Sequence, residues 1–374
     1  MKPQTSIERS SNRTASAGRI REQAMSILQQ AIADHVFPGA AFAVTQGEEI
    51  LTAGSAGRFT YEPDSPEILR GTVFDLASVT KVVATTAMAM TLYDQGKLDL
   101  NRKVMDVIPK FGSGDARDAR RRQITFRMLL AHSSGLPAYA RLFERVQTRD
   151  GLLNAIYSMP LDADPDTRAE YSDIGFILLG EALSRIAGEP LNQFCQREIF
   201  AKLAMNNTTY VPPANWKPAI PPTVDDQKFR RRVVQGEVND ENASVLGGVA
   251  GHAGVFSNVE DVSRFALSIL GYGPQLFRRE TISLFVTCQS IPAGTSRALG
   301  WDTPSAPSQS GQYFSANSCG HLGYTGTSLW IDNQRKLSIT LLTNRIWPHA
   351  DNQAIKQLRP KFHDAIMKEL LKFQ

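Results

Sequence analysis

The alternation of apolar and polar residues predicts that both ends of the chain form one β-sheet. An amphipathic helix is predicted first, over residues 20–32. Its apolar stripe consists of Ile20, Ala24, Ile27, Leu28, Ala31 and Ile32. Two β-favouring runs follow, over residues 40–45 and 49–53, and the turn 46–48 between them indicates a hairpin. A second hairpin is predicted near the C-terminus, where runs 328–332 and 337–344 flank a polar turn.

Helical patterns account for most of the remaining chain. A final helix is predicted with Pro360 in its first turn and Phe362, Ile366, Leu370 and Leu371 along one side. Between the two hairpins the predicted helices are 77–95, 125–131, 149–157, 174–187, 191–203 and 258–271. Ser257 and Glu260 have the spacing of a capping box before the last of these.

These elements predict an α/β (α+β) protein with one antiparallel sheet, flanking helices and an inserted helical region. The predicted unit spans residues 18–374 and follows a polar N-terminal segment, 1–17. Within the unit, residues 18–75 and 255–374 form an α/β subdomain. Residues 76–254 form a helical subdomain.

Composition excludes several classes of partner. With 374 residues, 42% of them hydrophobic and 21% charged, the chain matches a globular protein with a large core. The formal charge is only +4, and the basic runs 120–122 and 230–232 contain no interleaved aromatic residues. We expect both runs to be solvated loops, and we expect no nucleic-acid partner. Three scattered cysteines favour neither a disulfide framework nor a zinc site, and no pattern indicates an oligomeric state.

The start of the chain bears on its compartment. No apolar run approaches the ~18 residues that a membrane span needs, and residues 1–17 contain no apolar stretch typical of a secretory leader. As the sequence stands, this predicts a cytoplasmic protein. A periplasmic location would apply if a leader had been removed.

The pair Ser78 and Lys81 is the first candidate for chemistry. Residues three apart lie on one face of a helix, so the amine can contact the hydroxyl and help to activate it as a nucleophile. Ser78 is the only serine of the chain with a lysine three residues later. Residues 82–92 are almost entirely apolar, which predicts a buried helix and therefore a lysine with a specific partner or task.

Three other stretches have both a functional and a structural interpretation. Tyr171-Ser172-Asp173 precedes a helix and could simply pack and cap its first turn. His321-Leu322-Gly323-Tyr324 leads into the second hairpin, where glycine permits close approach to a ligand or marks a bulge. Residues 247–254 include four glycines, which suit a tight turn or the wall of a site.

Metal and nucleotide chemistry lack support in the sequence. The chain contains no Gly-x-Ser-x-Gly, His-Glu-x-x-His, phosphate-loop or Gly-x-Gly-x-x-Gly motif, and its six histidines are far apart. Asp240 and Glu241 are interpreted as loop carboxylates because no third ligand is near them in sequence. We expect no cofactor and no metal.

Ser78-x-x-Lys81, Tyr171-Ser172-Asp173 and His321-Leu322-Gly323 follow one another along the chain in an order that resembles the serine β-lactamase and penicillin-binding-protein superfamily. The chain is most similar to class C β-lactamases, their esterase relatives and the low-molecular-weight D-alanyl-D-alanine carboxypeptidases. Residues 74–85, 124–137 and 247–265 carry further resemblance, and the matches together extend over roughly residues 36–345. The fold that this resemblance implies agrees with the sheet and helices predicted above.

The resemblance also implies roles for individual residues. Ser78 would be the nucleophile, Lys81 its activating partner and Tyr171 the general base. The N–H groups of Ser78 and Tyr324 would form the oxyanion hole. His321 and Gly323 stand where these families carry Lys-Thr-Gly or His-x-Gly on a strand at the sheet edge.

A tyrosine can act as a base near neutral pH only if cations stabilise its anion. The phenol titrates near ~10 in water, so Lys81 and a protonated His321 are the candidates for that role.

Two departures from the family pattern bear on substrate choice. Asp173 replaces an asparagine, so a carboxylate stands where an amide donor is usual. Leu322 replaces a threonine or serine, and His321 is mostly neutral at pH 7 where lysine would be charged. The residues at 321 and 322 thus weaken the binding of a substrate carboxylate, and we therefore expect weak β-lactamase activity.

The resulting hypothesis is a serine hydrolase that forms an acyl-enzyme on Ser78 and hydrolyses small esters or amides. A D-alanyl-D-alanine carboxypeptidase or D-amino-acid peptidase is the nearest alternative. A non-catalytic protein that binds acyl or peptide ligands is an alternative of another class.

Overall fold

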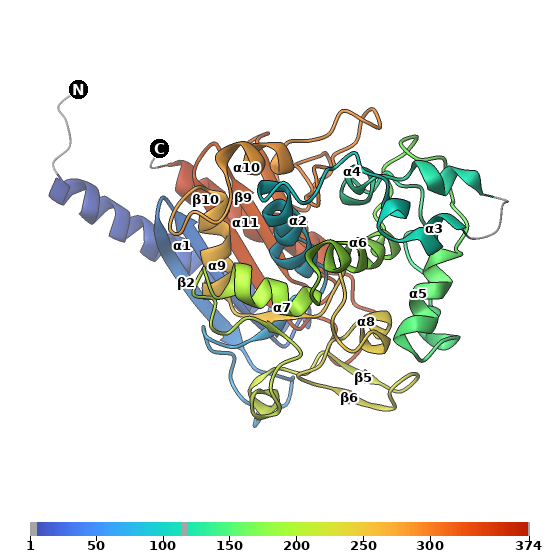
Figure 1. Cartoon of the computed structure of the whole chain (residues 1–374). Helices are drawn as coiled ribbons and strands as arrows, with labels where there is room; N and C mark the ends of the chain where they lie inside the picture. The colour runs from blue at the N-terminus through green and yellow to red at the C-terminus, as the bar shows by residue number, and fades with distance from the viewer. Residues whose placement is uncertain (1–5, 114–117, 373–374) are drawn as a thin grey trace.

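The computed structural model describes residues 6–113 and 118–372, and a five-stranded antiparallel sheet lies at its centre (Figure 1). The strand order is β2-β1-β10-β9-β8. The strands are β1 (Gly39–Gln46), β2 (Glu49–Gly57), β8 (Ser318–Leu322), β9 (Ser328–Asp332) and β10 (Leu337–Thr343). Both predicted hairpins are confirmed, and β1 pairs directly with β10. The two ends of the chain therefore build one sheet, as predicted.

Helices cover both faces of this sheet because its strands alternate their side chains between two cores. On β1, Phe42 and Val44 face a core shared with α1 (Ser6–Ala33) and α11 (Ile355–Leu371). Ala41 and Ala43 face the opposite core, which includes residues of α9 (Val259–Ile269). The fold class predicted from the sequence is confirmed.

The helical region lies beside the second face of the sheet (Figure 1). Its helices are α2 (Ala87–Asp94), α3 (Pro109–Ser113), α4 (Phe126–Leu130), α5 (Arg149–Tyr157), α6 (Asp173–Ala187), α7 (Leu191–Cys195) and α8 (Glu241–Val245). A further helix, α10 (Arg279–Val286), follows α9 in sequence. Small sheets join β3 (Phe74–Asp75), β7 (Val255–Ser257) and β4 (Thr209–Tyr210), and pair β5 (Val224–Asp226) with β6 (Arg232–Val234). Among the described residues, no helix has the length and apolar character of a membrane span.

Several local predictions are wrong. Asn258, rather than Ser257, caps α9, because its side chain accepts the backbone N–H of Asp261. Pro360 lies inside α11, which begins five residues earlier, at Ile355. The first turns of the predicted helix 77–95 are a 3₁₀ turn and a π-helical segment, and α2 begins only at Ala87.

The basic runs are also more than solvated loops. Arg121 is buried and donates to the carbonyl groups of Tyr157 and Ser158. The Arg230 side chain is only 6% exposed and pairs with Asp226. Each guanidinium holds neighbouring loops in place by satisfying carbonyl or carboxylate oxygens that are removed from water.

Candidate active site

The side chain of Lys81 is completely buried directly beneath Ser78. Ser78 lies in the 3₁₀ turn Ala77–Val79, and Lys81 begins the π-helical segment Lys81–Thr86. The Lys81 amine contacts Ser78 Oγ at 3.0 Å, Asp173 Oδ1 at 2.7 Å and the His252 carbonyl at 3.0 Å. The contact predicted from the three-residue spacing is therefore present. In the ammonium form, all three hydrogens of Lys81 have an acceptor.

A buried carboxyl group holds the turn that presents Ser78. Ala77 has φ of 47°, a left-handed conformation that is costly for a residue with a Cβ. Asp75 accepts the Ala77 N–H through Oδ1 at 2.8 Å and the Asn239 N–H through Oδ2 at 2.7 Å. Burial raises the pKa of Asp75 to about 6. Asp75 thus ties the nucleophile turn to the loop that precedes α8.

Tyr171 lies beside Lys81 and interacts with both Ser78 and Asp173. The Lys81 nitrogen lies 4.8 Å from the centre of the phenol ring, and the guanidinium carbon of Arg297 lies 5.5 Å from it. Burial raises the pKa of Tyr171 well above its ordinary value, while contact with Ser78 and the charge of Arg297 act in the opposite direction. The phenol therefore keeps its proton in the resting site.

His132 fixes the backbone around Tyr171. Its Nδ1 accepts the Ser172 N–H at 3.0 Å, and its ring lies 4.8 Å from that of Tyr171. Ser172 caps α6, since its hydroxyl accepts the Gly175 N–H at 2.9 Å. Both interpretations of this stretch therefore apply: Tyr171 enters the site and the next residue caps the helix.

Lys81 and Asp173 form an ion pair in which the lysine is the more buried partner. Burial lowers the pKa of Lys81 below its ordinary value, and the carboxylate of Asp173 opposes this shift. The negative charge that Asp173 brings in place of an asparagine is therefore paired with the ammonium group of Lys81.

His321 faces Tyr171 from β8, with 5.9 Å between the two ring centres. Its Nδ1 donates to the Leu322 carbonyl at 2.8 Å, so the neutral ring carries its proton there. Burial lowers the pKa of His321 well below its ordinary value. His321 is consequently neutral at pH 7, and Arg297 is the cation that lies near the Tyr171 ring besides Lys81.

The turn after β8 lies against the backbone of residues 75–76, just before Ser78 in sequence. Thr325 and Thr327 donate their hydroxyl hydrogens to the carbonyl groups of Asp75 and Leu76, both at 2.9 Å. A Cβ on Gly323 would lie 2.6 Å from the Leu76 oxygen and closer still to the Thr327 hydroxyl, so only glycine allows this approach. These contacts set the position of the Tyr324 N–H relative to Ser78.

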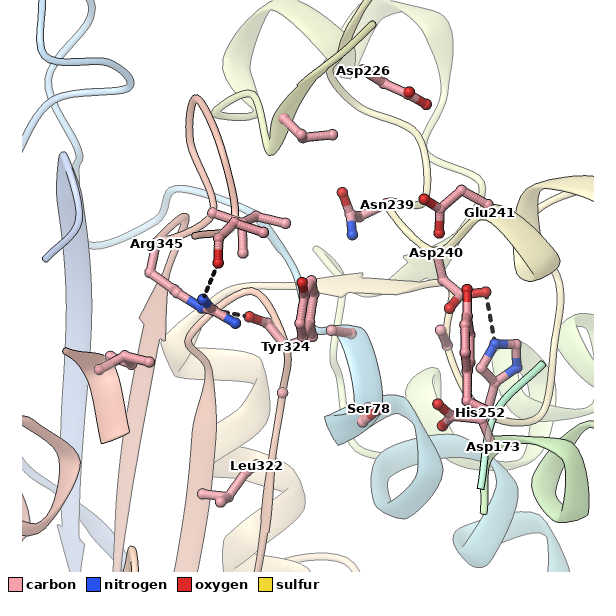
Figure 2. Close-up of a pocket in the computed structure, with 18 of the residues that line it drawn as sticks. Ser78, Asp173, Asp226, Asn239, Asp240, Glu241, His252, Leu322, Tyr324 and Arg345 are labelled. Carbon is pink, nitrogen blue, oxygen red and sulfur yellow. Dashed lines mark hydrogen bonds and ion pairs between the residues drawn. The ribbon is translucent and has the colours of Figure 1, made fainter. Parts of the chain in front are cut away.

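These residues surround one cavity of about 1340 Å³. Ser78, Tyr171, Asp173, His321, Gly323 and Tyr324 all line it, whereas Lys81 lies beneath its surface. Figure 2 shows Ser78 between two walls: Leu322, Tyr324 and Arg345 lie on one side, and Asp173, Asp240 and His252 lie on the other. The structure thus brings together every site residue predicted from the sequence.

The glycine-rich loop 247–254 forms part of the second wall. His252 Nε2 contacts Asp240 Oδ1 at 2.8 Å, and both residues line the cavity (Figure 2). At Gly251, a Cβ would lie 2.0 Å from the Phe176 carbonyl, so the loop packs closely on α6. Both interpretations of these glycines apply: Gly247, Gly248 and Gly254 have the positive φ of tight turns, and the loop carries His252 into the wall of the cavity.

The sequence did not indicate several residues of the site. Asp75, His132 and Arg297 support Ser78 or Tyr171, and two buried arginines, Arg345 and Arg359, line the cavity. The histidines, far apart in sequence, are not all far apart in space, because His132 and His321 both contact Tyr171. The only sequence signal was that 74–85 and 124–137, which contain Asp75 and His132, match the family pattern. No motif includes Arg297, Arg345 or Arg359.

The geometry is suited to transfer of an acyl group. The hydroxyl of Ser78 contacts the amine of Lys81 and the phenol of Tyr171 at the wall of the cavity. Ser78 and Tyr324 bring the backbone of two segments to the same cavity. A hydroxyl next to proton acceptors is an activated nucleophile. Backbone N–H groups can stabilise the oxyanion that its attack on a carbonyl group produces.

Comparison with known proteins agrees with this geometry. The family model described as Beta-lactamase matches residues 25–360. An N-acetylmuramyl-L-alanine amidase of Bacillus subtilis (strain 168) is 33% identical over 347 residues, which cover 83% of this chain and 77% of that protein. A putative D-alanyl-D-alanine carboxypeptidase of Escherichia coli (strain K12) is 31% identical over 309 residues, which cover 75% of this chain and 70% of that protein.

Solved structures share the fold at lower sequence identity. The hydrolase EstCE1, described as having promiscuous acyltransferase activity, has a TM-score of 0.77 at 20% identity, covering 94% of this chain and all of that one. A class C β-lactamase from Rhodobacter sphaeroides has a TM-score of 0.73 at 18% identity, and the match covers 93% of this chain and 99% of that one. Because the family model matches most of the chain, we conclude that the chain belongs to the β-lactamase family of serine hydrolases.

Proposed function

We propose that the protein hydrolyses esters or amides through an acyl-enzyme formed on Ser78. One observation carries this proposal: Lys81, completely buried, and Tyr171 both contact the hydroxyl of Ser78 at the edge of a large cavity. A lysine is rarely buried without a task, because burial disfavours its charged form.

In the proposed first step, Ser78 Oγ attacks the substrate carbonyl carbon. The carbonyl π bond opens to an oxyanion, which accepts hydrogen bonds from the N–H groups of Ser78 and Tyr324. Lys81 and Tyr171 take up the Ser78 proton as a coupled pair. The same pair returns the proton to the departing alcohol or amine as the carbon–heteroatom bond breaks.

In the second step, water attacks the acyl-enzyme. The pair takes a proton from the water, a second oxyanion forms in the same place, and its collapse breaks the ester bond to Ser78. The proton returns to Ser78 Oγ, and a carboxylic acid leaves. The nearby cation Arg297 favours any negative charge that develops on Tyr171 during this exchange.

A second candidate is a carboxypeptidase or amidase that acts on cell-wall peptides. The amidase of Bacillus subtilis and the carboxypeptidase of Escherichia coli described above favour it, since their names describe such activities. The size of the cavity also favours it, because about 1340 Å³ exceeds the ~300–1,000 Å³ typical of small-molecule sites. The neutral His321 and apolar Leu322 favour the ester candidate instead.

A substrate panel tests both candidates. Purified protein is given p-nitrophenyl butyrate, a chromogenic cephalosporin, a D-alanyl-D-alanine peptide and a muramyl peptide, with Ser78→Ala as the control. We expect the ester to be hydrolysed faster than the cephalosporin. Ser78→Ala should lose at least about 10³-fold in kcat/KM, because the nucleophile itself is missing. A cephalosporin turned over fastest of all would contradict the ester preference.

Intact-mass analysis distinguishes an enzyme from a non-catalytic binder. A fluorophosphonate should add one phosphonyl group to the protein and none to Ser78→Ala. Absence of an adduct, together with no turnover of any panel substrate, would leave only the binder.

A further inference from the structure

Arg359 is a buried cation that has no acidic partner within residues 6–113 and 118–372. Its side chain comes from α11, and the residue is only 4% exposed. Among the described residues, Arg345 is the only charged group that affects the pKa of Arg359, and it is also positive. Burial lowers the pKa of Arg359 to about 9, so the guanidinium stays charged at neutral pH. A buried unpaired charge is costly, and its retention indicates that its electric field is used.

The partners of this guanidinium show where the field acts. Arg359 Nη2 donates to the Gly323 carbonyl at 2.6 Å and to the Thr327 carbonyl at 2.8 Å, while Nη1 donates to Gln309 Oε1 at 2.9 Å. Gly323 and Thr327 flank the turn that carries Tyr324. The shorter bond is the important one, because the Gly323 C=O belongs to the same peptide unit as the Tyr324 N–H.

Polarisation passes across a peptide unit. A cation on the carbonyl oxygen draws electron density from the amide nitrogen, which makes the N–H more positive and a stronger donor. The gain in hydrogen-bond energy is largest for an acceptor with full negative charge, such as the oxyanion of the transition state. A neutral carbonyl oxygen of the bound substrate gains less.

We propose that Arg359 is a positioning residue that strengthens the Tyr324 N–H as an oxyanion donor. This inference rests on the proposed function, in which that N–H stabilises the oxyanion. Arg359 acts through the Gly323–Tyr324 peptide and need not touch the substrate.

Arg345, which follows β10 and contacts the same turn, provides a matched control. It is equally buried, and its Nε donates to the Tyr324 carbonyl at 2.8 Å. That carbonyl belongs to the next peptide unit, so Arg345 holds the turn without acting on the Tyr324 N–H. If Arg359 only held the turn, the loss of either arginine would have a similar effect.

The test compares Arg359→Gln, Arg359→Lys and Arg345→Gln with a neutral ester and with an alkylboronic acid, which forms a tetrahedral adduct on the serine. For Arg359→Gln we expect kcat/KM and boronate affinity to fall in parallel by about tenfold, with KM within about twofold. Arg359→Lys should recover most of this loss because it keeps a positive charge. Arg345→Gln should lose clearly less boronate affinity than Arg359→Gln at comparable Tm.

Three results would overturn the inference. The first is an equal loss of boronate affinity in the two glutamine variants. The second is a fall in kcat of Arg359→Gln with unchanged boronate affinity. The third is a loss confined to substrates that bear a carboxylate, which would assign Arg359 to direct substrate binding.

Folding failure would not prevent a decision. If Arg359→Gln does not fold, Arg359→Met, which keeps a long unbranched side chain without the charge, serves instead. A parallel loss in rate and boronate affinity then supports the inference, and a loss in only one of them opposes it. Failure of the proposed function is distinguishable, because Ser78→Ala would then keep its activity or bind the boronate as wild type does.

Discussion

At the scale of single residues, the site depends on shifts in pKa that arise from burial. Burial lowers the pKa of Lys81 and raises that of Tyr171, so of the two groups the phenol holds its proton more tightly. Asp173 opposes the shift of Lys81 through an ion pair of 2.7 Å. The carboxylate at position 173, rather than the amide usual in the family pattern, therefore controls how readily Lys81 gives up its proton.

Asp173→Asn should move the limb of the kcat/KM pH profile that Lys81 governs to lower pH. Removing the carboxylate leaves burial less opposed, so the Lys81 pKa falls further. The shift should be about one pH unit or more, a size typical of losing an opposite charge at this distance. The profile with a p-nitrophenyl ester, whose leaving group needs little protonation, measures it. Asp173→Glu, which keeps the charge, is the control, and an unmoved profile in Asp173→Asn would contradict this electrostatic role.

At the scale of elements, the chain from β3 to the 3₁₀ turn that carries Ser78 combines backbone strain with a buried acid. Ala77 has a left-handed conformation, and Asp75 holds it by accepting the Ala77 and Asn239 N–H groups. Thr325 and Thr327 bind the carbonyl groups of the same strand from the turn after β8. The two N–H donors of the proposed oxyanion hole thus come from segments that are hydrogen-bonded to each other.

Asp75→Asn should alter the pH dependence of stability. The Asp75 pKa is about 6 in the fold, above its ordinary value of 3.8, so protonation of Asp75 stabilises the folded state. That contribution is complete below about pH 4 and is lost as the pH rises through about 6. Relative to wild type, the unfolding free energy of the asparagine variant should therefore rise by up to about 3 kcal/mol between pH 4 and pH 7.

Urea denaturation at both pH values measures this difference. Asp64→Asn removes an exposed carboxylate and serves as the control. A difference between Asp75→Asn and wild type that does not change with pH would refute the raised pKa.

At the scale of the whole molecule, the two ends of the chain jointly form the frame that holds the site. Strand β1 pairs with β10, and α1 packs with α11 over the outer face of the sheet. Phe42 of β1 and Phe362 of α11 meet edge to face, with 5.7 Å between ring centres. The same helix α11 carries Arg359 to the turn after β8.

Phe362→Ala should destabilise the protein by about 3–5 kcal/mol. The ring is fully buried between the sheet and α1, and its loss leaves a cavity in that core. Chemical denaturation measures the change. Lys361→Ala, at an exposed position of the same helix, should stay within about 0.5 kcal/mol of wild type. A small effect at position 362 would show that this core does not hold the chain ends together.

The sequence allowed the frame to be predicted because its signals are local. The two hairpins, the long helices and the Ser78–Lys81 contact all follow from periodicity and spacing over a few residues. Errors arose where tertiary contacts override local preference. Asn258 replaces Ser257 as the cap of α9 because Ser257 is used in strand β7, and Pro360 is tolerated inside α11. The division into two subdomains stays a prediction.

The sequence by itself determined the family pattern, the sheet shared by the two chain ends and the contact of Lys81 with Ser78. Only the tertiary structure decided the charges and partners of the site residues. The proton of His321 lies on Nδ1, Asp173 is paired with Lys81, and Arg359 lies behind the Tyr324 peptide, because burial and contacts between distant segments set these properties. A one-dimensional pattern specifies which groups are present, whereas the energy of a charge depends on everything that surrounds it in space.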